Sequence, residues 1–133
     1  MIPKREAELK AAFSQELKAR LPGFMLLFLA SPGAPDRAVV GGGRTTYLEF
    51  KHGTPSFDSP GLQELTCMRL EAAGECRYVV WQESAAGIGQ RTLIVKPRAV
   101  HRRDGWLLDA EETFLGFDHH SVIQWLKERH GLR

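Results

Sequence analysis

Three consecutive glycines, Gly41 to Gly43, separate two segments of strand character and constrain the fold more than any other feature. Residues 37–40 form a short strand candidate, and residues 45–51 are rich in β-branched and aromatic side chains. Glycine adopts positive φ angles without steric cost, so it suits a tight turn between antiparallel strands. The sequence therefore predicts a β-hairpin, which would bring the residue before the first strand close to the end of the second.

The other segments alternate between helical and strand patterns. Residues 3–21 carry an apolar side chain at every fourth position, from Leu9 to Leu21, which predicts an amphipathic helix. The further predicted elements are strands at 24–30, 77–82 and 91–96, a helix at 60–73 and a last helix at 119–130 with Asp118 as its N-cap. Residues 101–112 are charged and rich in turn formers. The order α-β-β-β-α-β, followed by an extra strand and a C-terminal helix, predicts an α/β fold with a mixed central sheet flanked by helices.

Length and composition indicate one globular domain. The chain has 133 residues, 43% of them hydrophobic and 26% charged, so we expect a single domain with a core motif at 3–95 and an extension at 96–133. The net charge of +2 neither requires nor excludes nucleic-acid binding. The longest apolar run, residues 24–30, is too short to span a membrane, and the N-terminus lacks the apolar segment of a signal peptide. Two isolated cysteines, Cys67 and Cys76, fit a reducing cytoplasm.

Residues of opposite charge lie two positions apart on the second hairpin strand. Side chains alternate along a strand, so Leu48 and Phe50 should face the core while Glu49 and Lys51 share the other face. On their own these two would be a weak ion pair on a solvated edge strand. The predicted hairpin, however, brings Asp36 beside Glu49, and two neighbouring carboxylates are tolerable when a divalent cation lies between them. Oxygen ligands favour Mg²⁺ or Mn²⁺, and a nearby lysine suits metal-assisted hydrolysis of a phosphodiester.

These residues resemble a known family. Gly33-Ala34-Pro35-Asp36 and Glu49-Phe50-Lys51, separated by the glycine-rich turn, are similar to the bipartite motif of PD-(D/E)XK nucleases. The closest branch is the VRR-NUC (virus-type replication-repair nuclease) domain, because Ser59-Pro60-Gly61-Leu62-Gln63 matches its helix start and residues 70–74 match its helix end. The resemblance covers residues 3–83. It implies a restriction-endonuclease-like fold and a metal-dependent endonuclease that acts on DNA, including branched or junction DNA.

The resemblance also implies roles for single residues. Asp36, Glu49 and the backbone carbonyl of Phe50 would hold Mg²⁺ or Mn²⁺, and Lys51 would position the attacking, metal-activated water. Gln63 would lie at the mouth of the site. The family's helical glutamate, a further metal ligand of the catalytic site, could be Glu6, Glu8 or Glu16. Glu6 is chosen because it falls within the apolar stripe that faces the sheet.

Arginines are the expected phosphate contacts, since they outnumber lysines by 12 to 6. The candidates are Arg37, Arg44, Arg69, Arg77, Arg91, Arg98, Arg102 and Arg103, and the densest basic stretch runs from residue 96 to 103. Stand-alone members of the family resemble symmetric junction-cutting enzymes, which implies a homodimer with the C-terminal helix as a candidate contact. The implied setting is the cytoplasm of a bacterial or phage-infected cell.

Other chemistries find less support. Asp118-His119-His120 could suggest an HNH nuclease, but such a site uses a downstream asparagine and the sequence has none. The cysteines and histidines lack the short spacings of a zinc site, so we expect Asp118 to cap a helix and the histidines to lie at the surface. The glycine turn lacks the spacing of a nucleotide-binding loop. The main alternative is a non-catalytic DNA-binding or recruitment module that retains the nuclease fold; a phage accessory protein has no positive feature in its favour.

Overall fold

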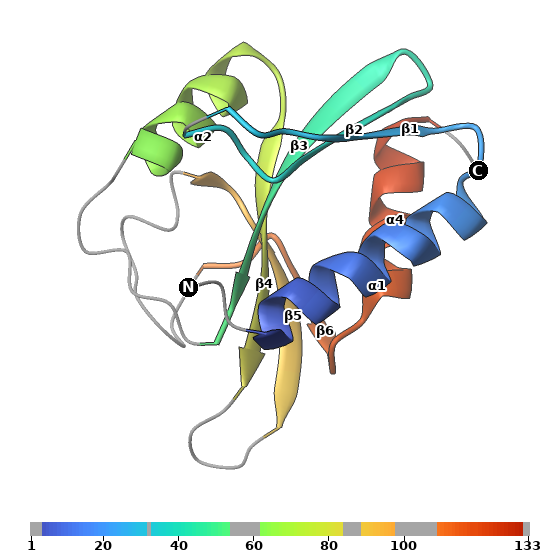
Figure 1. The fold of residues 1–133 in the computed structure, drawn as a ribbon, viewed down its shortest axis with the longest axis vertical. Helices are drawn as coiled ribbons and strands as arrows, with labels where there is room; N and C mark the ends of the chain where they lie inside the picture. The colour runs from blue at the N-terminus through green and yellow to red at the C-terminus, as the bar shows by residue number, and fades with distance from the viewer. Residues whose placement is uncertain (1–3, 32, 54–61, 84–88, 98–108, 132–133) are drawn as a thin grey trace.

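The structure is a computed structural model that describes residues 4–31, 33–53, 62–83, 89–97 and 109–131. Nine elements occupy these ranges (Figure 1): α1 Lys4–Arg20, β1 Met25–Phe28, β2 Arg37–Gly41, β3 Arg44–His52, α2 Leu62–Ala73, β4 Cys76–Glu83, β5 Gln90–Val95, β6 Glu112–Leu115 and α4 His119–Arg129. The predicted α-β-β-β-α-β order is therefore confirmed. None of the described helices is long and apolar enough to cross a membrane.

The six strands form one mixed sheet in the order β1-β2-β3-β4-β5-β6. Strands β1, β2 and β3 form an antiparallel meander, whereas β3 and β4 are parallel. A parallel pair needs a crossover connection, and α2 lies in that connection. Strands β5 and β6 then continue antiparallel to β4. The sheet is thus mixed, as the element order predicts.

Helices cover both faces of the sheet and bury two separate clusters of apolar side chains. Helices α1 and α4 lie on one side and α2 lies on the other (Figure 1). The larger cluster contains Phe13 and Leu17 of α1, Phe50 of β3 and Trp81 of β4. The smaller cluster contains Cys67 of α2. Alternation along the strands explains the division, because neighbouring positions on a strand face opposite sides.

The hairpin between β2 and β3 closes as the glycines predict. Gly41 pairs with Arg44, which leaves a two-residue turn at Gly42 and Gly43 with φ angles of 60° and 79°. Two positive φ angles define a type I′ turn, whose twist matches that of the flanking strands. A Cβ at Gly42 would also overlap the carbonyl oxygen of His130, so the turn packs tightly against the end of α4.

The C-terminal third differs from the prediction in two ways. Strand β6 was not predicted: only its first residue, Glu112, lies in the stretch expected to be turn-rich, and its four residues pair with β5, with Thr92 opposite Phe114. A strand this short is specified by its distant partner rather than by its own pattern. Of the histidines expected at the surface, His120 is exposed as predicted, but the prediction is wrong for His130, which is 2% exposed with its Nε2 2.8 Å from Thr46 Oγ1. His119 is half-buried and lies edge-on to Phe13. Asp118 does cap α4, as expected, by accepting from Ser121 N at 2.9 Å.

Candidate active site

Asp36 and Glu49 are brought together by the β2–β3 hairpin. The register pairs Arg37 with Leu48, so the next positions outward, Asp36 and Glu49, face each other at the end of the ladder. Asp36 N donates to Glu49 Oε1 at 3.0 Å, and Phe50 N donates to Asp36 Oδ2 at 2.9 Å. Each carboxylate is therefore held by the backbone of the opposite strand, which fixes both side chains on rigid elements.

Glu49 is a buried carboxylate with an unusual protonation equilibrium. Its side chain is 4% exposed. Burial raises the pKa of Glu49 to about 9; the neighbouring Asp36 carboxylate adds to the rise, and the Lys51 ammonium opposes it. Burial therefore favours the neutral form of Glu49 at neutral pH. Added cationic charge beside Glu49 would favour its ionised form.

Lys51 lies on the same strand as Glu49 and on the same face. Its Nζ is 3.5 Å from Glu49 Oε2, and its side chain is 26% exposed. The ammonium is thus next to the carboxylate pair while remaining accessible to solvent. Phe50, between them, points the other way and stacks on Trp81 with ring centroids 5.0 Å apart. This alternation is what the sequence predicts for residues 47–51.

A second lysine, Lys10 of α1, reaches the Asp36 carboxylate and was missed by sequence reasoning. Its Nζ is 3.1 Å from Asp36 Oδ1 and 3.4 Å from Glu6 Oε2, and its side chain is 11% exposed. The spacing of four residues could have suggested the pair with Glu6. The contact with Asp36, however, depends on how α1 packs on the sheet, so no local pattern could reveal it.

Among the three helical glutamates, Glu6 is the one that shares an ion-pair partner with Asp36. Glu6 is linked to Asp36 through Lys10, with its own side chain 15% exposed. Glu8 instead pairs with Arg5, and Glu16 pairs with Arg20 at 2.9 Å. Glu6 lies beside the carboxylate pair, but the Lys10 ammonium stands between it and Asp36.

The donor set fits a hard divalent cation with open coordination positions. Within the described residues, no group of three or more histidine, cysteine, aspartate or glutamate side chains is placed to enclose a metal ion. Mg²⁺ needs no such cage, because it commonly uses one or two carboxylates and keeps several waters. Asp36 and Glu49 supply the two carboxylates, and a cation beside Glu49 would oppose the effect of burial, which disfavours its ionised form.

The other predicted residues lie at several places. Arg37 adjoins the carboxylates, and its Nη1 donates to the carbonyl oxygen of Asp36 at 3.0 Å. Arg44 starts β3, about 16 Å from Glu49 at 3.3 Å per residue, and donates to the carbonyl oxygen of Arg129 at 2.8 Å. Gln63 lies in α2, but its side chain is outside the described part, as are Arg98, Arg102 and Arg103 and the helix start at residues 59–61.

Arg77 is not a phosphate contact. The side chain is 2% exposed, and its guanidinium pairs with the carboxylates of Glu71 and Glu111. A buried arginine whose donors are taken by carboxylates has none to offer a ligand. The expectation was wrong because position on a strand does not reveal which charged residues become buried.

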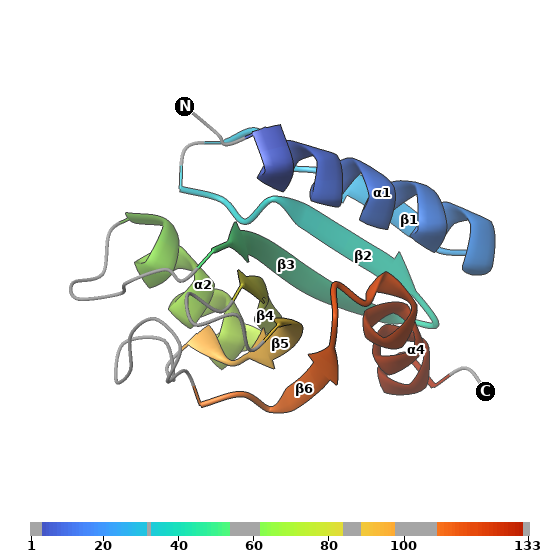
Figure 2. The ribbon, with the colours of Figure 1, turned by 90° about the horizontal axis from the view of Figure 1, so that it is seen from below.

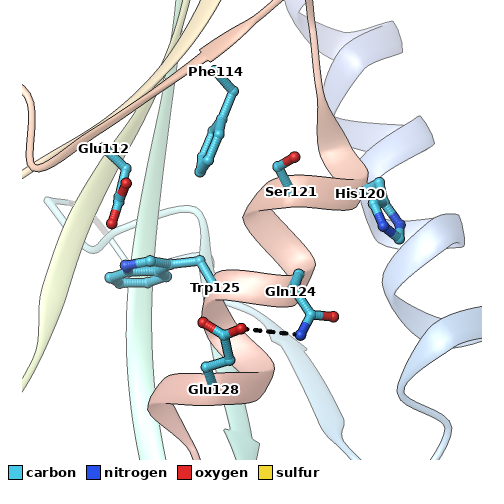
Figure 3. A pocket seen from close by; sticks show the side chains of 7 residues that line it. All are labelled: Glu112, Phe114, His120, Ser121, Gln124, Trp125 and Glu128. Atoms are coloured by element: carbon cyan, nitrogen blue, oxygen red, sulfur yellow. Dashed lines mark hydrogen bonds between the residues drawn. The ribbon is translucent and has the colours of Figure 1, made fainter. Parts of the chain in front are cut away.

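A separate hollow between β6 and α4 contains none of the predicted site residues. Its volume is about 280 Å³, and Figure 3 shows Trp125 and Phe114 facing it with Glu112 and Glu128 at its edges. The Glu128 carboxylate accepts from the Gln124 amide at 3.2 Å. This hollow has no pair of carboxylates linked by backbone donors, so the end of the β2–β3 hairpin remains the candidate active site.

Comparison with known proteins yields a likeness at the level of fold. No protein-family model matches the chain, and no curated protein matches it. Among solved structures, the chain is similar to Hjc of Archaeoglobus fulgidus, a Holliday junction resolvase from an archaeal hyperthermophile, at 17% identity and a TM-score of 0.46. The match covers 92% of this chain and 96% of that chain. At these values the likeness carries no argument about the site or its chemistry.

Proposed function

We propose that the protein is a deoxyribonuclease that uses Mg²⁺ or Mn²⁺ to hydrolyse DNA phosphodiester bonds. The observation that supports it is the pair of carboxylates, Asp36 and Glu49, held across a hairpin with Lys51 Nζ 3.5 Å from Glu49 Oε2. Two carboxylates and an adjacent ammonium at an accessible strand end suit metal-assisted hydrolysis better than any other set in the described residues. The PD-(D/E)XK resemblance of the same three residues points the same way.

The chain's own groups have distinct tasks in this proposal. Asp36 and Glu49 hold the cation, with the Phe50 backbone carbonyl as a third oxygen. When bound, the cation supplies a Lewis acid for the phosphate and lowers the pKa of water. Lys51 orients the attacking water and stabilises the negative charge that develops on the phosphate oxygens. Glu6 and Lys10 set the charge around Asp36, and Gln63 is assigned to the mouth of the site.

The resemblance extends the proposal to branched DNA cut by a homodimer. Two active sites related by a two-fold axis would match two equivalent phosphodiesters in a junction. The exposed part of α4 is the proposed contact surface, and Arg37, Arg98, Arg102 and Arg103 are the proposed phosphate contacts. Sedimentation of the purified protein tests the dimer directly, since a monomer at all concentrations would contradict it.

Cleavage assays with matched variants test the nuclease proposal. Labelled linear, flap, splayed and four-way-junction DNA are incubated with the protein in EDTA, Mg²⁺ or Mn²⁺. We expect metal-dependent cutting that Asp36→Asn abolishes and that Lys51→Met reduces by at least about a hundredfold. Glu112→Gln on β6 and Arg20→Met at the end of α1 alter exposed residues outside the proposed site and contact surface, so these controls should cut as the unaltered protein does.

Each outcome separates the candidate functions. Ranking the four substrates distinguishes a junction-selective enzyme from a general nuclease. DNA binding without cutting in either metal, unchanged by Asp36→Asn and Lys51→Met, would contradict the nuclease and establish the non-catalytic DNA-binding module. Cutting by Lys51→Met at the unaltered rate would contradict the role of Lys51 alone.

A further inference from the structure

A groove next to the carboxylates contains an aromatic ring and three cationic side chains. It lies between α1 and the β1–β2 pair, which run side by side in Figure 2, and has a volume of about 490 Å³. Six of the side chains that line it carry the argument: Lys10, Ser14, Lys18, Phe28, Asp36 and Arg37. Its volume falls in the range of small-ligand sites, roughly 300–1,000 Å³. Lys10 and Asp36 line the groove and also belong to the candidate active site, so the two are continuous.

Phe28 presents its ring at this groove instead of packing in the core. The residue is 61% exposed although it lies on β1. The Arg37 guanidinium carbon lies 4.0 Å from the ring centroid, and Lys18 Nζ lies 5.7 Å from it. Both cations therefore make cation–π contacts with the ring, yet most of the residue stays exposed, so ring surface remains on which a flat ligand that carries negative charge can stack.

Arg37 is fixed in place by its neighbours. Its Nη1 donates to the Asp36 carbonyl oxygen at 3.0 Å, and its Nε is 3.5 Å from Ser14 Oγ. Both acceptors are neutral, so neither hydrogen bond is an ion pair. Within the described ranges no carboxylate lies within ion-pair distance of Lys18 or Arg37, whereas Lys10 is matched by Glu6 and Asp36. The groove thus offers, beside an exposed ring, two cations that make no direct ion pair, although the Asp36 and Glu49 carboxylates attract Arg37 from a longer distance.

We propose that this groove binds one unpaired nucleotide of a DNA strand, with its base stacked on Phe28 and its phosphate between Lys18 and Arg37. Stacking on an aromatic side chain beside cationic groups is how proteins bind single strands without sequence preference. A base in a duplex is already stacked and paired, so only an unpaired nucleotide fits. The inference rests on the proposed nuclease function and names its substrate class: DNA with an unpaired nucleotide next to the phosphodiester that is cut.

Binding measurements in EDTA test the groove without relying on cleavage. A splayed duplex with 2-aminopurine at the fork, a blunt duplex of the same sequence and a free mononucleotide are titrated with the protein. We expect the splayed duplex to bind tightest and its 2-aminopurine fluorescence to be quenched on binding. Phe28→Ala should weaken this binding by about tenfold. Phe28→Tyr keeps an aromatic ring and should bind the splayed duplex as tightly as the unaltered protein does. Leu115→Ala is the matched control, because Leu115 is an apolar residue, 90% exposed, on β6 at the other edge of the sheet.

The outcomes distinguish this inference from the proposed function. The proposal for the groove is contradicted if splayed and blunt duplexes bind equally, or if Phe28→Ala leaves the affinity unchanged. Either result holds even where Asp36→Asn abolishes cutting. Tight binding of the mononucleotide alone also overturns it, since the ligand would then be a free nucleotide. If binding of the splayed duplex depends on Phe28 but neither metal supports cutting, the result supports nucleotide binding in the groove and contradicts the nuclease function.

Discussion

At the scale of single residues, the candidate site is a balance of charges at the end of a hairpin. Asp36 and Glu49 are fixed by backbone donors, and Lys10 and Lys51 approach them from two different elements. Alternation along β3 made Glu49 and Lys51 predictable from the sequence, and the glycine turn made the approach of Asp36 predictable. Lys10 was not predictable, because its contact with Asp36 joins residues 26 positions apart.

The raised pKa of Glu49 predicts how stability depends on pH. The folded protein holds a proton on Glu49 up to a pH of about 9, whereas the ordinary carboxyl value is 4.5. Because the folded state binds more protons, the free energy of unfolding should fall as pH rises from about 4.5 to 9. Glu49→Gln removes the titrating group, so this dependence of the free energy of unfolding on pH should disappear. The variant should be more stable than the unaltered protein at pH 9, by about 1–4 kcal/mol.

Urea unfolding in EDTA across this pH range measures the effect, and the difference between the two proteins isolates Glu49 from other titrating groups. Excess Mg²⁺ should make the free energy of unfolding of the unaltered protein less dependent on pH, since a bound cation favours the ionised carboxylate. Identical slopes in both proteins would contradict the assignment of the raised pKa to Glu49.

At the scale of elements, the β2–β3 hairpin sets the register that brings the two carboxylates together. A slip of one residue would turn every side chain of a strand to the opposite face. The two-residue turn prevents this, because both of its residues need positive φ angles. The sequence indicated this hairpin clearly, since the glycines and the strand patterns on both sides agree. It did not indicate β6, whose four residues depend on pairing with β5.

Alanine at the two turn glycines should have unequal effects. Gly43→Ala introduces only an unfavourable φ angle, with open space around its Cβ, and should lower the free energy of unfolding by about 1–2 kcal/mol. Gly42→Ala adds an overlap with the His130 carbonyl oxygen and should cost more than Gly43→Ala, as well as weakening metal-dependent cutting. Urea unfolding of both variants measures the difference; equal losses would show that the contact with His130 is unimportant.

At the scale of the whole molecule, the packing of α1 on the sheet completes the charge balance of the site. Phe13 of α1 meets Phe50 of β3 with ring centroids 5.1 Å apart, which anchors the helix beside the hairpin. The same packing brings Lys10 and Glu6 to Asp36 and forms the groove beneath Phe28. These contacts join the N-terminal helix to residues far along the chain, so they exist only in the folded protein.

Replacing Lys10 tests this view of the molecule. Lys10→Met removes the buried ammonium between Glu6 and Asp36 and leaves their carboxylates uncompensated. We expect the free energy of unfolding in EDTA to fall by about 3 kcal/mol, and Mn²⁺ to raise the melting temperature of the variant more than that of the unaltered protein. Thermal unfolding with and without Mn²⁺ checks this, with Lys127→Met as the control; an equal response to Mn²⁺ in Lys10→Met and the unaltered protein would contradict it.

The sequence by itself determined the features that depend on neighbouring residues: the helices at either end, the glycine turn, the alternation along β3 and the cap at Asp118. Each follows from a local period or a local backbone requirement, which is present before the chain folds. Only the tertiary structure decided the features that depend on distant partners. These are the burial of Arg77 and His130, the pairing of β6, and the placing of Lys10 against Asp36. Their energies come from desolvation and contacts between segments far apart in the chain, and no local pattern encodes those.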